Sequence, residues 1–279
     1  MWSTFWKKYV KQNESGTKGF VEVNSAKRSG RLFIPRSRRL TLDVLHFHRQ
    51  VDTCAHDRQF DLSKIAGLRS RLPVRISWAV LFIKAFGVVA ANRPVLRQTF
   101  QRWPWPHIYQ HAHNVAMLAT HRIHQDEPWV FLSRFEKPEE RTLINLQTSL
   151  DSCLTEPVTK AFRQQWELSG LPTFLRRMFW WWTLNVALGK RAHRAGTFFF
   201  TTLAGKGVEI QDPPSFFTSN LTYGPLDEKN RSRVTMSYDH RLMDGSTVAD
   251  CLIELEAVLN GSISDELATM VPETRETSR

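Results

Sequence analysis

Nine residues near the end of the chain, Ser237-Tyr238-Asp239-His240-Arg241-Leu242-Met243-Asp244-Gly245, form its sharpest sequence feature. They follow a β-like run over 233–238 and precede a helical pattern of apolar residues over 246–260. A histidine at a strand end beside a tight turn can be both ordered and partly exposed. It is also the side chain best suited to exchange protons near neutral pH. Asp244 could cap the following helix or pair with an arginine, and Gly245 permits a close backbone approach.

The pattern upstream mixes helices and strands along the whole chain, which is typical of a single α/β domain. We expect this domain over 31–262, preceded by a mobile or extended arm over 1–30 and followed by a polar, frayed tail over 263–279. Gly261 is expected to cap the last helix. The other expected strands are 53–61, 115–120, 129–135, 197–203 and 216–223. The other expected helices are 38–51, 62–72, 76–92, 137–166 with a break at Pro157, and 173–193.

Composition narrows the class of protein. The chain has 279 residues, 42% hydrophobic residues and 23% charged residues, which is ordinary globular composition. Its net charge of +11 favours polyanionic partners such as a phosphate-bearing cofactor, anionic lipid or nucleic acid. We identify no secretory signal and no transmembrane span. Three widely spaced cysteines indicate free thiols in a reducing, cytoplasmic compartment.

Two stretches carry a family resemblance. Residues 237–245 resemble the DHRxxDG signature of the acyltransferase component of 2-oxoacid dehydrogenase complexes. They are similar also to the HxxxDG motif of chloramphenicol acetyltransferase, which shares that fold. Gly196-Thr197-Phe198-Phe199-Phe200-Thr201-Thr202-Leu203 resembles the GTFTISNLG strand of the same family. Fainter likenesses at 36–51 and 76–94 extend the resemblance over roughly 31–262. It implies a chloramphenicol acetyltransferase-like α/β fold, with a mixed sheet and packed helices.

The resemblance also implies roles for individual residues. His240 would be the general base that deprotonates a thiol, hydroxyl or amine acceptor, which then attacks an acyl thioester. Thr201 would donate a hydrogen bond to the tetrahedral oxyanion, with Thr202 as the nearby alternative. Asp244 would form a structural ion pair with an arginine, for which Arg38 and Arg39 are candidates. Gly245, Ser237 and Thr202 would lie on the substrate side of the site.

The implied assembly is a homotrimer whose active site lies between two subunits. Acyl-CoA would be a cosubstrate, and we expect neither a tightly bound cofactor nor a metal. The sequence shows nothing like a lipoyl domain, and the segment between the GTFTIS-like strand and His240 is shorter than in dehydrogenase cores. The acceptor, the acyl length and the choice between CoA and a carrier protein therefore stay open.

Two other classes of protein compete with an acyltransferase. One is a catalytically inactive scaffold or binding protein with the same fold. The other is a nucleic-acid-binding protein, although the basic residues are dispersed and no known nucleic-acid motif is present, so we predict no such partner. Histidines such as His111 and His113 show no metal-site spacing.

The apolar run within 176–191 has three interpretations. It packs in the core or at a subunit contact, it lines a hydrophobic acyl or acceptor pocket, or it lies at a membrane interface. The membrane contact would be peripheral and would involve Phe179, Trp180, Trp181 and Trp182. The separate run 102–107 is expected to be an irregular loop, either a lid over substrate or a packed surface loop.

Overall fold

The computed structural model describes Arg31 and residues 33–272. Contacts divide the chain into a unit Met1–Ile34 and a compact unit Pro35–Arg279, and the fold below is that of the second unit. The arm expected over 1–30 lies outside the described residues.

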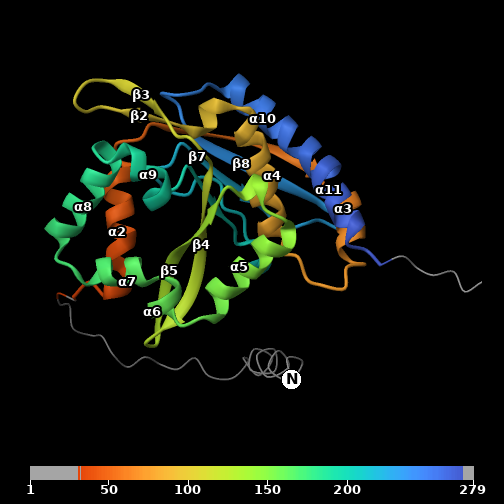
Figure 1. The fold of residues 1–279 in the computed structure, drawn as a ribbon, viewed down its shortest axis with the longest axis horizontal. Helices are drawn as coiled ribbons and strands as arrows, with labels where there is room; N and C mark the ends of the chain where they lie inside the picture. Colours follow the sequence, from red (N-terminus) through yellow and green to blue (C-terminus); the bar gives the residue numbers. More distant parts are fainter. Residues whose placement is uncertain (1–30, 32, 273–279) are drawn as a thin grey trace, which may run out of the picture. The chain divides into compact units, whose positions relative to one another are not determined.

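A six-stranded mixed sheet forms the centre of the compact unit, in the order β1-β8-β7-β6-β4-β5 (Figure 1). The parallel pairs are β4 with β6 and β6 with β7, whereas the other neighbours run antiparallel. The strands are β1 (Thr53–Asp61), β4 (Val115–His124), β5 (Glu127–Glu136), β6 (Phe198–Thr201), β7 (Ser219–Tyr223) and β8 (Arg231–Asp239).

Helices bury one face of this sheet in a large apolar core. Its principal helices are α4 (Trp78–Asn92), α5 (Leu143–Thr155) and α10 (Gly245–Val258). Helix α4 begins where the Ser77 side chain accepts a hydrogen bond from the Val80 amide, and it ends before Pro94, which cannot continue it. Its apolar residues point in nearly all directions because other elements surround it. On this face β6 contributes Phe198 and Phe200.

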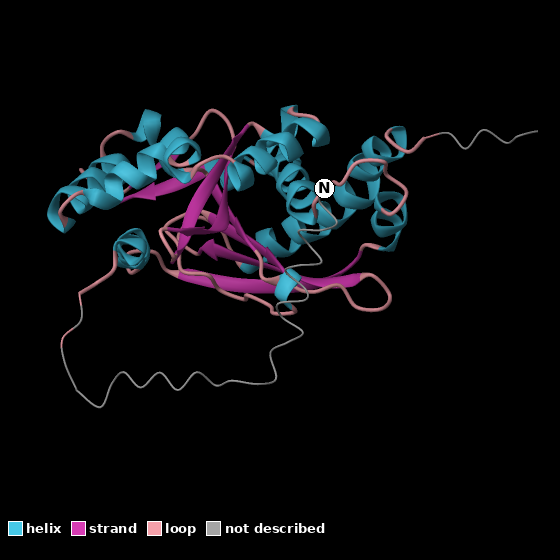
Figure 2. Cartoon of the chain, turned by 90° about the horizontal axis from the view of Figure 1, so that it is seen from below, coloured by secondary structure: helices cyan, strands magenta, loops and turns pink. Residues whose placement is uncertain are grey.

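The opposite face of the sheet divides into an apolar part and a polar part. Helices α2 (Arg36–His48), α8 (Thr173–Asn185) and α9 (Leu188–Ala195) contribute to a second apolar cluster with β4 and β6. Figure 2 shows helices and strands as separate layers. Beside that cluster, Thr222 and Ser237 are buried, and their hydroxyls donate to the carbonyls of Ile210 and Gln211. The crossing loop between β6 and β7 thus satisfies polar groups of the sheet.

Most expected elements are confirmed, with shifted ends. The break at Pro157 is confirmed, since it separates α5 from α6 (Val158–Ala161) and α7 (Arg163–Gly170). The helix expected over 62–72 is the shorter α3 (Ser63–Arg69). The helix expected over 173–193 is divided into α8 and α9, since the chain turns at Val186 and Ala187.

The irregular loop expected over 102–107 is confirmed for 102–106. It joins two strands that we did not expect, β2 (Gln98–Gln101) and β3 (His107–Gln110), which pair as a hairpin. Gly261 interrupts the helix, since its backbone is non-helical, but the chain then continues into a further helix that we did not expect, α11 (Ser264–Thr269). Leu267 of α11 is buried in the core, so the folded domain extends past 262 into the segment expected to be a frayed tail.

Candidate active site

His240 follows the last residue of β8 and is exposed. Its amide donates to the Asp52 carbonyl at 2.9 Å, which ties the turn to the segment before β1. Its ring Nδ1 lies 3.1 Å from the Met243 carbonyl oxygen. A carbonyl can only accept, so Nδ1 carries the proton in this bond and Nε2 of the neutral ring keeps its lone pair. This bond therefore leaves Nε2 of the neutral tautomer available as a hydrogen-bond acceptor.

The residues on either side of His240 form an ion-pair clamp. Arg241 donates to both carboxylate oxygens of Asp239, at 2.7 and 2.6 Å, and to the Gln50 carbonyl at 2.8 Å. Asp239 is only 4% exposed. Bidentate geometry fixes both orientation and position, so the clamp holds the backbone on both sides of the histidine.

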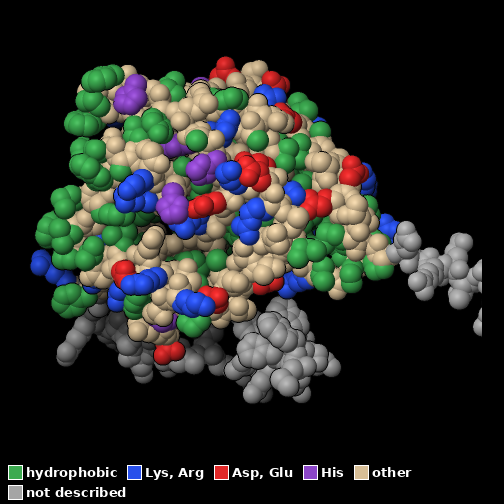
Figure 3. Space-filling model, in the orientation of Figure 1, with side chains coloured by type: hydrophobic (Ala, Val, Ile, Leu, Met, Phe, Trp, Pro, Cys, Tyr) green, Lys and Arg blue, Asp and Glu red, His purple; other side chains and the backbone are tan. Residues whose placement is uncertain are grey.

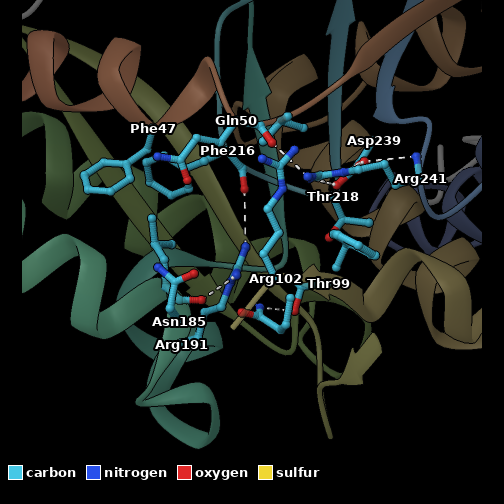
Figure 4. Close-up of a pocket in the computed structure, with 14 residues that line it drawn as sticks. Phe47, Gln50, Thr99, Arg102, Asn185, Arg191, Phe216, Thr218, Asp239 and Arg241 are labelled. Atoms are coloured by element: carbon cyan, nitrogen blue, oxygen red, sulfur yellow. Dashed lines mark hydrogen bonds and ion pairs between the residues drawn. The ribbon is translucent and has the colours of Figure 1, made fainter. Parts of the chain in front are cut away.

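A polar cavity of about 70 Å³ lies against this clamp (Figure 4). Arg102, Arg191, Asp239 and Arg241 are among its lining residues. Burial lowers the pKa of Arg191 to about 10. Its guanidinium donates to the carbonyls of Leu184 and Phe216. Sequence reasoning missed Arg191, since one arginine in a basic run does not stand out. Its contacts join α8, α9 and the segment before β7.

Asp244 begins helix α10. Its carboxylate accepts from the Thr247 amide at 2.9 Å and from the Thr247 hydroxyl at 3.0 Å, and these bonds hold its pKa below the ordinary value. The ion pair expected with Arg38 or Arg39 is absent among the described residues. Arg39 donates instead to the Ser169 carbonyl.

Helix α2 does form a buried ion pair with another helix, but it does not involve Asp244. Its Asp43 forms a buried ion pair with Arg176 of α8, at 2.7 Å. Gly245, which follows the Asp244 cap, lies against His56 of β1, where a Cβ would collide with the ring. His56 is exposed, so a larger residue at this position would require its ring to rotate away.

Thr201 and Thr202 end β6 but differ in their partners. The Thr202 hydroxyl donates to the Tyr223 carbonyl at 2.9 Å and accepts from the Ala204 amide at 3.0 Å, so it is already used in the turn. The Thr201 hydroxyl has no hydrogen-bond partner among the residues that the structure describes. Since side chains alternate along a strand, Thr201 shares a face with Phe199. Of the two candidate oxyanion donors, Thr201 is therefore the one whose hydroxyl makes no other hydrogen bond among the described residues.

The structure separates Thr201 from His240 within one chain. Thr201 pairs with Thr222 of β7, which pairs with Thr235 of β8. Since β8 runs antiparallel to β7, His240 lies five residues farther along, at the opposite end of the sheet. Five residues of extended strand span about 17 Å, which no hydrogen bond can bridge. The register therefore separates the candidate residues of one chain into two groups. We call them the His240 half-site, with Asp244, Gly245 and Ser237, and the Thr201 half-site, with Thr202.

An apolar cavity of about 530 Å³ opens on the face of the sheet that carries Phe199. It extends between α2, β4, β5, the α6–α7 region and the segment before β7. Its apolar lining includes Val44, Met117, Leu132, Trp180 and Phe217. The cavity was not predicted as such, although one interpretation of the tryptophan run was a pocket wall. Within the run, Trp180 lines this cavity, whereas Leu184 packs in the second apolar cluster.

Comparison with known proteins identifies the fold. No protein-family model and no curated protein matches the sequence. A structure described as a probable dihydrolipoamide acetyltransferase from Listeria monocytogenes superposes with a TM-score of 0.61 at 14% identity, covering 91% of this chain and 99% of that one. The dihydrolipoamide acetyltransferase of Azotobacter vinelandii gives 0.59 at 15%, with 90% and 99% covered. A truncated catalytic core of the 2-oxoacid dehydrogenase complex from Thermoplasma acidophilum gives 0.60 at 13%, with 84% and 99% covered.

These likenesses show that the chain has the fold of 2-oxoacid dehydrogenase acyltransferase cores. The fold predicted from the two motifs is therefore confirmed. At such low identity the comparison concerns the fold, and the chemistry has to be argued from the site itself.

Proposed function

We propose that this protein is an acyltransferase that moves an acyl group from an acyl thioester, most simply acyl-CoA, to a thiol, hydroxyl or amine acceptor. Its site is formed where the His240 half-site of one subunit meets the Thr201 half-site of the next, in a homotrimer. The observation that carries this proposal is the geometry of His240, an exposed histidine held by its backbone and by Nδ1, with Nε2 free.

His240 acts as the general base. Its Nε2 accepts the proton of the acceptor as the nucleophile attacks the thioester carbonyl, and the resulting imidazolium then supplies a proton to the departing thiolate. The Met243 carbonyl fixes the ring in the tautomer that this step needs. The Asp239–Arg241 clamp positions the turn without touching the reacting atoms.

Thr201 supplies the oxyanion donor. Thr201 is 9% exposed in the single chain, and its hydroxyl has no partner among the described residues. A preorganised donor in a water-poor site stabilises developing charge more strongly than water does. Because the register keeps this hydroxyl far from His240 of the same chain, a second subunit must supply the histidine.

The substrates follow from what borders the Thr201 half-site. The 530 Å³ cavity on its face suits the apolar part of an acyl group or acceptor. The net charge of +11 suits a phosphate-bearing acyl donor such as CoA.

The comparison with one acetyltransferase supports the residue roles. In the Azotobacter vinelandii acetyltransferase, a serine, a histidine and an asparagine were investigated for their role in the catalytic mechanism. That histidine and asparagine are separated by four positions, as are His240 and Asp244 here. We propose the same function for His240, with Thr201 in place of the serine hydroxyl.

Thiol release tests the proposal. Wild type and His240→Ala would be mixed with acyl-CoAs of rising chain length and pooled acceptors, and free CoA would be measured with a thiol reagent. We expect release by wild type and a loss of at least about a hundredfold in the variant, the usual contribution of a general base. His193→Ala is a matched control, since this exposed histidine pairs with Glu136 away from the site. Equal rates for wild type and His240→Ala, or no release with either CoA or carrier-protein thioesters, would indicate the inactive scaffold instead.

A further inference from the structure

One surface of the compact unit is rich in exposed aromatic side chains. It combines two segments that are distant in sequence, the β2–β3 loop and helix α8. We call it the aromatic surface. Its members are each between 40 and 69% exposed: Trp103 and Trp105 from the loop, and Phe174, Met178, Trp181 and Trp182 from α8.

The two segments meet at a ring contact. Trp103 and Trp181 pack edge to face with centroids 6.0 Å apart. On α8 the exposed residues recur at positions 174, 178, 181 and 182, a helical stripe that faces away from the core. Arg176 and Thr183 are buried on the opposite side of the helix. Hydrophobic side chains gather along the left edge of Figure 3, where Figure 1 places the hairpin and α8.

The charge around the aromatic surface has one sign. No aspartate or glutamate occurs anywhere in 98–125 or in 168–208, the two stretches that contain it. Arg102 and Lys190 are exposed within these stretches, and the Arg177 side chain is 42% exposed while it lies 3.9 Å from the buried carboxylate of Asp43. The neighbouring Arg194 stacks over Phe179 at 5.6 Å. Tryptophan beside cationic side chains is the composition of a surface that inserts at the boundary of an anionic bilayer.

We propose that the aromatic surface docks this protein on a membrane that contains anionic lipid. The tryptophan rings would lie among the headgroups and the acyl carbons next to them, with Arg102, Arg177 and Lys190 against lipid phosphates. None of the described helices is long and apolar enough to cross a bilayer. Helix α8 therefore lies in the plane of the interface rather than through it. A two-fold contact between two aromatic surfaces would instead bring like charges together.

Vesicle co-sedimentation tests this proposal. Full-length protein would be mixed with vesicles of phosphatidylcholine alone, and with vesicles in which part of it is replaced by phosphatidylglycerol. We expect binding to the anionic vesicles that weakens at high salt, and at least about tenfold weaker binding to phosphatidylcholine alone. Trp181→Ser/Trp182→Ser should weaken binding at least about tenfold, and Lys190→Glu should weaken it on anionic vesicles only.

The control is Ile253→Ser on α10, which removes an apolar side chain that is 51% exposed elsewhere. It should bind as wild type does. Circular dichroism and soluble acyl-CoA turnover should be unchanged in the tryptophan variant. Failure of wild type to bind either vesicle, or binding that the tryptophan changes leave intact, would overturn the proposal. Light scattering that shows the tryptophan variant in a smaller assembly would assign the surface to a contact between copies, which also contradicts membrane docking.

Discussion

The two ends of the sheet place the two proposed catalytic residues, His240 and Thr201, in different surroundings. At one end His240 is exposed and held by an ion-pair clamp and two backbone carbonyls. At the other end Thr201 is 9% exposed, on the face that carries the apolar cavity. A base must exchange protons with substrate and solvent, whereas an oxyanion donor is most effective away from water. The difference teaches that one chain keeps His240 and Thr201 apart, which is why we propose that a neighbouring subunit completes the site.

We expect the largest effect on activity from removing the Thr201 hydroxyl. Thr201→Val should lower kcat about a hundredfold to a thousandfold, the range observed when one oxyanion donor is removed. Thr201→Ser should retain most activity. Thr202→Val, which removes a hydroxyl already bound to Tyr223 and Ala204, should act mainly through stability. Steady-state acyl-CoA kinetics with thermal midpoints distinguish these cases. A larger kcat loss in Thr202→Val than in Thr201→Val would transfer the donor role to Thr202.

A second prediction concerns acid sensitivity near the His240 end. Burial, followed by the charges of Arg191 and His113, lowers the pKa of His111 from 6.5 to about 4. The unfolded chain therefore binds this proton at a higher pH than the folded chain does. The free energy of unfolding should fall as pH drops from about 6.5 to about 4, by up to about 3 kcal/mol from this group. Urea midpoints of wild type and His111→Gln across this range would measure it. Parallel pH profiles for the two proteins would contradict the assignment.

We expect the smallest effect, a change in thermal stability, from substitutions of Asp244. Asp244→Ala removes the cap of α10 and should lower the thermal midpoint by a few degrees, since N-caps contribute modestly to stability. Asp244→Asn can still accept from Thr247 and should stay near wild type. Hydrogen bonds from Thr247 lower the pKa of Asp244. As pH falls, the cap should therefore be lost only at a pH below the range in which aspartate usually titrates. A loss in Asp244→Asn as large as in Asp244→Ala would indicate that the negative charge, rather than the cap, is what matters.

The periodicity of apolar residues predicted those helices and strands whose bounds depend on the local sequence. Strand β1 is bounded as expected, and α4 ends before Pro94 as expected, because alternation and proline chemistry act within a few residues. The β2–β3 hairpin was missed because its two strands are short and its loop is rich in proline and tryptophan. Helix α11 was missed because its composition is polar, and its one fully buried leucine, Leu267, is stabilised by contacts with the distant core.

The resemblance named the candidate site residues and implied that His240 and Thr201 of one chain lie apart, but it did not indicate which cavities lie near them. The histidine at the end of β8 lies as the motif indicated, and Thr201 ends β6. The ion pair of Asp244 with Arg38 or Arg39 was a poor prediction for the single chain, because helix capping satisfied the carboxylate locally. The cavity could not be predicted, since its walls come from helices and strands brought together only by the fold.

Subunit complementation tests the central claim most directly. His240→Ala and Thr201→Val would be unfolded, mixed in equal amounts and refolded together, with each variant refolded alone as a control. In a closed trimer with sites between neighbours, random mixing should restore about one quarter of wild-type sites, because each site needs an intact His240 from one subunit and an intact Thr201 from the next. Activity near that level, from two variants that are inactive alone, is the result we predict. Mixed trimers with no more activity than the separate variants would show that the two residues do not act across a subunit boundary.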